Sequence, residues 1–130
     1  MSELPVVVIG AGPLGLAAAA HLLERGRGHY LITSSVAGRR ALPGSLYSAT
    51  KWAATAIGES LRQELRQMQD NDRIKVTMIE PGMVDTPFFD NRPTSALEAD
   101  DIAAAVAYAI SQPDRVDVNE ILIRPSSQPT

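Results

Sequence analysis

Short apolar runs alternate with helical segments along this 130-residue chain, and this alternation is the feature that most restricts its fold. Four runs rich in β-branched side chains, as in strands buried on both faces, lie at residues 5–9, 29–33, 74–79 and 118–123. Segments with apolar residues at helical spacing lie at 14–25, 46–68 and 98–110. This order predicts an α/β domain in which crossover helices join the strands of a parallel sheet of about four strands.

The direction in which the strands add decides where the helices lie. Crossovers between parallel strands are almost always right-handed. If all strands add in one direction, every crossover helix lies on one face, and the other face of the sheet is bare and apolar. We therefore expect either dimerisation or low stability of the isolated chain.

Length and composition exclude several classes of protein. A chain of 130 residues has room for one domain, and a net charge of −3 without a run of Lys or Arg argues against binding to nucleic acid or to an anionic membrane. Without cysteine, and with only two histidines, the chain offers no usual metal site. The apolar stretch near the start is too short to span a bilayer and lacks the basic flank of a signal peptide. We expect a cytoplasmic protein.

A glycine-rich turn directly follows the first predicted strand. Gly10, Gly12 and Gly15 form a G-x-G-x-x-G pattern between that strand and a predicted helix. Here the glycines allow a tight turn and the close approach of a pyrophosphate, and the helix N-terminus offers unpaired N–H groups to phosphates. The pattern predicts dinucleotide binding, with the alternative that the glycines only tighten the connection. The acidic residue that usually holds the ribose is missing, because the second strand runs into hydroxyl residues at 33–35.

A second candidate site lies at the start of the long helix predicted at 46–68. Tyr47 and Lys51 are four residues apart, so their side chains lie on one face of that helix. An ammonium group beside a phenol stabilises the phenolate, which brings a tyrosine into range for proton transfer with an alcohol or carbonyl group. A hydroxyl from Ser35 would steady the charge that develops on the substrate oxygen. The alternative is a solvated helix face, which is the commoner setting of a Tyr/Lys pair.

Three segments around these residues resemble the short-chain dehydrogenase/reductase family. They read HYLITSSVAGRRALPGSLYSATK from residue 29, ESLRQEL from residue 59 and RIKVTMIEPGMVDTPFF from residue 73. The Y-x-x-x-K motif of the family matches Tyr47 and Lys51, and its active-site serine matches Ser35. The resemblance implies a Rossmann-like fold in which the tyrosine is the general acid/base. It also implies that the lysine lowers the pKa of the tyrosine and binds the nicotinamide ribose, while the serine orients the substrate.

The segment after the third predicted strand matches the P-G-x-x-x-T motif of the same family. By resemblance, Pro81, Gly82, Val84 and Thr86 belong to the cofactor site, with Val84 and Thr86 as the main contacts of the nicotinamide carboxamide. The resemblance therefore implies NAD(P)(H) as cofactor and a small alcohol or carbonyl compound as substrate. In the family the helix that matches 46–68 builds subunit interfaces, so we expect a homo-oligomer through this helix.

The N-terminal segment looks different. Residues 5–26, PVVVIGAGPLGLAAAAHLLERG, resemble the FAD- and NAD-binding start of flavoprotein oxidoreductases. We therefore interpret the chain as two segments of different ancestry, 1–26 and 28–124, joined in one Rossmann-like domain. Strands that precede 29–33 in a complete family member are absent, as is the N-N-A-G segment with its catalytic asparagine. FAD ranks below a nicotinamide cofactor, because it needs more pocket than one βαβ unit provides.

Two hypotheses about function follow. The first is an NAD(P)-dependent oxidoreductase that transfers a hydride between the cofactor and an alcohol or ketone. The second is an inactive truncated or chimeric chain that acts as an interaction or dimerisation module through 46–68. Pairing of strand 5–9 beside 29–33 favours the first, because the glycine turn and the Tyr/Lys helix then line the same edge of the sheet.

Smaller features carry expectations of their own. Gly58, inside a helix, indicates that something packs closely against it. Trp52 is expected to pack, and Arg39 with Arg40 is expected to be a solvated loop pair, with recognition of a 2′-phosphate as the alternative. The Pro/Ser-rich tail at 125–130 is expected to be frayed.

Overall fold

The computed structural model describes residues 7–9, 13–43, 46–68, 73–87, 89–91 and 93–129. Four strands form one sheet in sequence order, namely β1 (Val7–Ile9), β2 (Gly28–Thr33), β3 (Ile74–Pro81) and β4 (Glu120–Ile123). Every neighbouring pair is parallel, with Ile9 opposite Leu31 and Leu31 opposite Thr77. The predicted α/β, Rossmann-like fold with a parallel sheet of about four strands is confirmed.

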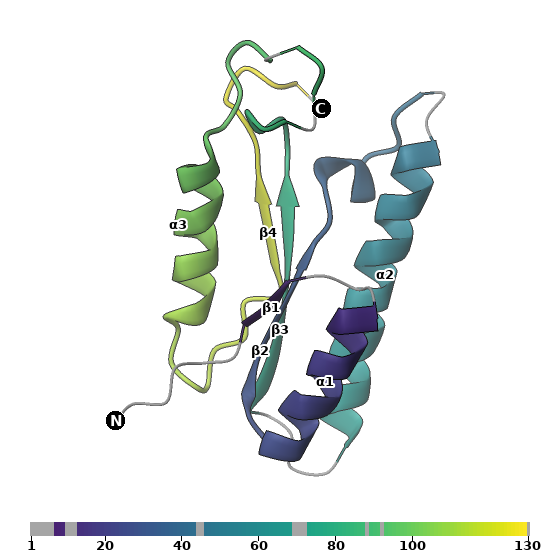
Figure 1. Ribbon diagram of the computed structural model, residues 1–130, viewed down its shortest axis with the longest axis vertical. Helices are drawn as coiled ribbons and strands as arrows, with labels where there is room; N and C mark the ends of the chain where they lie inside the picture. The colour runs from purple at the N-terminus through teal and green to yellow at the C-terminus, as the bar shows by residue number, and fades with distance from the viewer. Residues whose placement is uncertain are drawn as a thin grey trace.

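Helices cover both faces of this sheet. They are α1 (Pro13–Arg25), α2 (Leu46–Gln67) and α3 (Ala99–Ile110), with a short 3-10 helix η1 (Val36–Gly38) after β2. Figure 1 shows α1 and α2 on one side of the sheet and α3 on the other.

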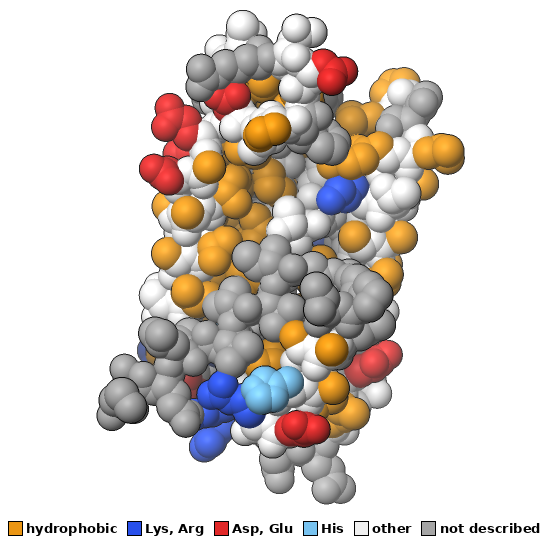
Figure 2. All heavy atoms as spheres, viewed as in Figure 1, with side chains coloured by type: hydrophobic (Ala, Val, Ile, Leu, Met, Phe, Trp, Pro, Cys, Tyr) orange, Lys and Arg blue, Asp and Glu red, His pale blue; other side chains and the backbone are white. Residues whose placement is uncertain are grey.

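The expectation that all helices share one face is therefore wrong. The strands do add in one direction, so helices on opposite faces require crossovers of opposite hand. The connection between β3 and α3 leads from the end of β3 to the face of the sheet opposite α1 and α2, where α3 lies (Figure 1). The face predicted to be bare thus has a helix of its own, and hydrophobic side chains gather over and beside α3 in Figure 2.

The core lies between the sheet and the pair α1 and α2. Alternate residues of the two central strands point to this side, because successive side chains of a strand point to opposite faces. Its buried members are Leu22, Tyr30, Ile32, Leu65, Ile74, Val76 and Met78. A Cβ atom on Gly58 would lie 2.6 Å from Met78 Sδ and 3.0 Å from Ile32 Cδ1. The predicted close packing at Gly58 is confirmed, and it brings α2 against the sheet.

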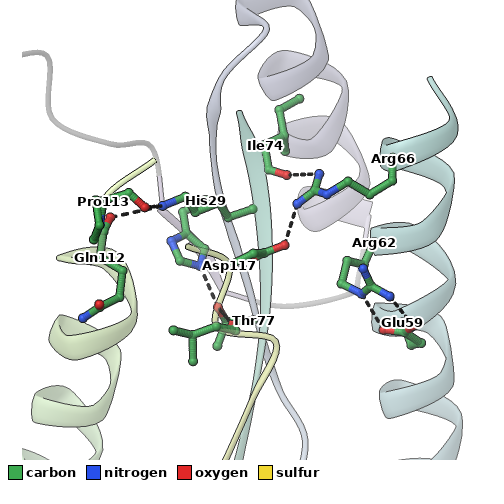
Figure 3. Close-up of polar contacts among 11 residues, drawn as sticks. His29, Glu59, Arg62, Arg66, Ile74, Thr77, Gln112, Pro113 and Asp117 are labelled. Atoms are coloured by element: carbon green, nitrogen blue, oxygen red, sulfur yellow. Dashed lines mark hydrogen bonds and ion pairs between the residues drawn. The ribbon is translucent and has the colours of Figure 1, made fainter. Parts of the chain in front are cut away.

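Polar contacts fasten the connection between α3 and β4 to the strands (Figure 3). His29 Nε2 lies 2.7 Å from Thr77 Oγ1, and the Thr77 hydroxyl donates to the carbonyl of Val118 at 2.5 Å. On α2, Arg66 donates to Asp117 Oδ2 at 2.5 Å and to the carbonyl of Ile74 at 2.8 Å. Helix α2, β2 and β3 are thereby tied to the segment that leads into β4.

Two expectations about smaller features are wrong. Trp52 does not pack in the core, since it is 46% exposed on α2. The C-terminal tail is not frayed through its described part, because Pro125 is buried and Gln128 accepts a hydrogen bond from the backbone of Met83. None of the helices in the described part of the chain combines the length and the hydrophobicity needed to cross a bilayer.

Candidate active site

The carboxyl ends of β1, β2 and β3 lie at one edge of the sheet. β1 pairs directly with β2 in parallel, from Val7 opposite His29 to Ile9 opposite Leu31. This is the pairing that the first hypothesis requires. Of the predicted phosphate-binding glycines, Gly10 and Gly12 lie outside the described residues, and Gly15 lies in the first turn of α1, which begins at Pro13.

A cavity of about 730 Å³ lies at this edge. Side chains and backbone from the ends of β2 and β3, the start of α2, the loop after β3, the start of α3 and the C-terminal tail surround it. The lining residues are Thr33, Ser34, Ser35, Val36, Leu42, Tyr47, Lys51, Pro81, Gly82, Met83, Val84, Thr86, Phe89, Ala99, Ile102 and Gln128.

Most of the predicted site residues meet at this cavity. The predicted catalytic residues Ser35, Tyr47 and Lys51 line it, and so do the predicted cofactor contacts Pro81, Gly82, Val84 and Thr86. They come from three segments that are distant in sequence and that the parallel sheet brings together. Their chemical roles stay predictions.

Tyr47 and Lys51 lie on the first two turns of α2. Lys51 Nζ is 5.6 Å from the centre of the Tyr47 ring, as expected for side chains four residues apart. The same ammonium group lies 3.4 Å from the carbonyl of Thr33 at the end of β2. Tyr47 is 38% exposed, so its ring is accessible from the cavity side. The pair places a cation and a phenol at the edge where parallel strands end.

Ser35 begins the short helix η1. Its backbone is extended, and its Oγ accepts a hydrogen bond from the amide of Ala37 at 3.1 Å. The Ser35 hydroxyl donates to the carbonyl of Pro81 at 3.4 Å, which is longer than an ordinary hydroxyl–carbonyl bond. The Ala37 contact fixes the oxygen in place, and the weak Pro81 contact leaves the proton available to a stronger acceptor.

Ser34 has different partners. Its Oγ lies 3.0 Å from the carbonyl of Lys51 and 2.8 Å from Thr55 Oγ1, both on α2. Gly38 makes this approach possible, because a Cβ there would lie 2.5 Å from Ser34 Oγ and 2.7 Å from Thr55 Oγ1. Ser34 therefore fastens the end of β2 to the helix that carries Tyr47 and Lys51.

A partly buried ion pair joins β3 to the residue that follows η1. Glu80 in β3 is 1% exposed, and its Oε1 accepts from Arg39 Nε at 2.9 Å. Burial raises the pKa of the Glu80 carboxyl, and the Arg39 guanidinium opposes this change. Arg39 also pairs with Glu120 of β4. Only Arg40 is exposed, so the expectation of a solvated arginine pair is wrong for Arg39.

The sequence did not point to several residues of the cavity wall. Leu42 and Phe89 stand inside the quoted family-like segments but carry no motif of their own, and Ile102 belongs to the apolar face of α3. Gln128 stands in a tail whose composition is typical of a frayed end, and no pattern in the sequence singles it out.

The family model for short chain dehydrogenases matches residues 6–97, which contain the Ser35, Tyr47/Lys51 and Pro81–Thr86 motifs of the cavity. The chain belongs to the short chain dehydrogenase family. The match begins inside the first strand and continues through the N-terminal segment. A flavoprotein origin of residues 5–26 is therefore not supported.

Individual relatives agree with the family. Human dehydrogenase/reductase SDR family member 11 is 40% identical over an alignment of 119 residues that covers 79% of this chain and 45% of the human protein. The chain spans about half the length of the curated relatives it matches.

Solved structures of dehydrogenases share the fold. A serine dehydrogenase complexed with NADP+ superposes with a TM-score of 0.77 at 28% identity, over 88% of this chain and 51% of that one. An alcohol dehydrogenase from the archaeon Thermococcus sibiricus, complexed with 5-hydroxy-NADP, gives a TM-score of 0.68 at 31% identity, over 84% and 46% of the two chains.

Proposed function

We propose that this chain carries the active site of an NAD(P)-dependent oxidoreductase, which moves a hydride between a nicotinamide cofactor and an alcohol or carbonyl substrate. The observation that supports it most is the single cavity shared by Ser35, Tyr47, Lys51 and the segment 81–86. Two similar structures add support, since the serine dehydrogenase is complexed with NADP+ and the archaeal alcohol dehydrogenase with 5-hydroxy-NADP.

The cavity wall fits the nicotinamide end of such a cofactor. A volume of about 730 Å³ lies within the range of small-molecule sites. In the proposed arrangement Lys51 holds the ribose hydroxyls, and Val84 with Thr86 holds the carboxamide, while Val36 and Met83 offer apolar surface to a flat ring. The bound cofactor supplies the hydride acceptor for alcohol oxidation, or the hydride donor for the reverse reaction.

Tyr47 is the residue that we assign to proton transfer. Its phenolate oxygen takes the proton from a substrate alcohol during oxidation, and in the reverse reaction its hydroxyl gives this proton to the carbonyl oxygen and becomes the phenolate. The Lys51 ammonium group, 5.6 Å from the ring centre, stabilises the phenolate between these steps. The Ser35 hydroxyl, which donates only a long hydrogen bond to the Pro81 carbonyl, donates to the substrate oxygen instead and stabilises the charge that develops there.

Replacing Tyr47 by Phe tests this assignment, because the change removes one hydroxyl and keeps the ring. We expect turnover of a secondary alcohol with NAD+ or NADP+ to fall by a factor of about 10²–10⁴, the usual contribution of a general acid/base. Cofactor binding should be retained. Tyr108→Phe removes an exposed hydroxyl from α3 outside the cavity lining and should leave turnover unchanged. Equal turnover in wild type and Tyr47→Phe would contradict the assignment.

We also infer that the chain forms a homo-oligomer through α2. Part of the apolar stripe predicted for this helix is exposed, with Leu46 85% and Ile57 54% exposed and Ala49 and Ala53 exposed between them. Trp52 adds further exposed apolar surface beside the stripe. Contiguous apolar surface of this kind is typical of a contact between proteins.

A further inference from the structure

The C-terminal segment after β4 lies beside the loop after β3 at the carboxyl edge of the sheet (Figure 1). The segment turns at Pro125, which is buried, and the amide of Gln128 donates to the Pro125 carbonyl at 3.0 Å. This turn brings the Gln128 side chain to the cavity, where its Oε1 accepts a hydrogen bond from the amide of Met83 at 2.9 Å. A side chain close to the C-terminus thus contacts the backbone of the predicted cofactor loop.

Gly82 makes the contact possible. Its amide donates to the carbonyl of Ile123 at 2.7 Å, which continues the pairing of β3 with β4 beyond the strand. A Cβ at Gly82 would collide with the side chain of Gln128 and would lie 2.6 Å from Arg124 Cβ. The absence of a side chain at position 82 therefore gives Gln128 the space that it occupies.

On its other side the loop is held by backbone contacts with Leu97. Leu97 donates to the carbonyl of Met83 at 2.9 Å and accepts from the amide of Asp85 at 2.8 Å. Val84, the predicted carboxamide contact, lies between Met83 and Asp85 in the sequence. Backbone bonds therefore hold the loop at Leu97 and at Ile123, and the amide oxygen of Gln128 adds a side-chain contact to Met83 that a single substitution removes.

We propose that Gln128 is a positioning residue for the nicotinamide site: it fixes the amide of Met83 and thereby the backbone of Val84 and Thr86 in the conformation that binds the cofactor. This inference rests on the proposed function. Gln128 acts here through the loop. Its loss should weaken cofactor binding because the loop must then be ordered by the cofactor itself.

The test compares wild type, Gln128→Ala and Ser127→Ala, all as the full chain. Ser127 is the exposed neighbour of Gln128 and serves as the matched control. The first readout is hydrogen exchange of the Met83 amide by NMR without cofactor, with the Gly82 amide as internal reference. The second readout is the Kd for NADPH and NADH from nicotinamide fluorescence.

In Gln128→Ala we expect Met83 to exchange about tenfold faster and the cofactor Kd to rise about tenfold, as for the loss of one well-formed hydrogen bond. Gly82 exchange should stay within about twofold, which shows that the variant is folded. Gln128→Glu keeps an acceptor oxygen at the same chain length and should restore protection of Met83. Ser127→Ala should match wild type in both readouts.

Unchanged Met83 exchange in Gln128→Ala would overturn the inference. Faster exchange with an unchanged Kd would also overturn it, because the contact would then have no part in binding. If wild type binds neither NADPH nor NADH, the proposed function fails and the positioning role with it. In that case the exchange of Met83 still reports separately whether the contact exists.

Discussion

Ser34 and Ser35 follow each other at the end of β2, yet their hydroxyl groups have different partners. Successive side chains of an extended backbone point in opposite directions. Ser34 therefore contacts Lys51 and Thr55 of α2, and Ser35 contacts the Pro81 carbonyl at the cavity. Two adjacent hydroxyl groups are equivalent by residue type. The family motif pointed to Ser35, and the contacts give the physical reason why the two differ.

His29 is the residue whose titration should matter most for stability. It is 4% exposed, and burial lowers its pKa from 6.5 to about 4. The unfolded chain binds a proton below about pH 6.5, while the folded chain does so only near pH 4. The folded state is therefore favoured above pH 6.5, and this contribution is lost as the pH falls toward 4. We expect a loss on the order of 2 kcal/mol across this window.

Urea unfolding at several pH values between 7 and 4 measures this contribution. His29→Gln keeps a donor for Thr77 and removes the titration, so its free energy of unfolding should fall less than that of wild type over the same range. The difference between the two curves isolates the imidazole from the carboxyl groups that also titrate. Parallel curves would contradict the account.

At the level of elements, the sequence predicted each α-helix and strand close to its place, but not the short helix η1. α1 ends at Arg25, and the next residue, Gly26, has a φ of +68° and donates to the Leu22 carbonyl at 2.9 Å, as expected for a glycine that follows a helix end. The last strand begins at Glu120 instead of 118. The reason lies in a side chain, because the Val118 carbonyl accepts the hydroxyl of Thr77.

Helix α2 shows what a periodic pattern leaves open. Spacing by three and four defines an apolar stripe, but it does not tell which part of the stripe meets the sheet. The buried residues of α2 are Ser48, Thr55, Gly58 and Leu65, of which Leu65 belongs to the apolar core and Gly58 lets the helix approach Ile32 and Met78. Leu46 and Ile57 are left exposed. The proposed contact between copies through α2 would cover them.

Ile57→Glu tests that surface. If α2 forms the contact between copies, the substitution buries an unpaired carboxylate there and should weaken self-association on the order of 100-fold, measured by sedimentation equilibrium. The control is Arg115→Glu, which changes an exposed residue between α3 and β4. A wild type that sediments as a monomer, or equal association of wild type and Ile57→Glu, would contradict a contact through α2.

At the scale of the whole molecule, the sheet was predictable and the path of the chain between its faces was not. Hydrophobic runs and helical spacing specify elements, and parallel strands bring their carboxyl ends to one edge, so the motifs of Tyr47 and Thr86 were expected to meet. The hand of a crossover depends on where a long connection leads, which neither periodicity nor composition describes. The contact of Gln128 with Met83 could not be predicted either, because it also depends on the path that the chain takes after a strand.

We propose that residues from α2 and from the loop after β3 form one nicotinamide site. Titration of NADPH and NADH into wild type, Lys51→Ala and Arg115→Ala, followed by nicotinamide fluorescence, tests it most directly. Arg115 is an exposed cation outside the cavity lining and controls for the loss of positive charge. We expect saturable binding by wild type and Arg115→Ala, with a Kd at least about tenfold higher in Lys51→Ala. Absence of saturable binding, or equal binding by wild type and Lys51→Ala, would contradict it.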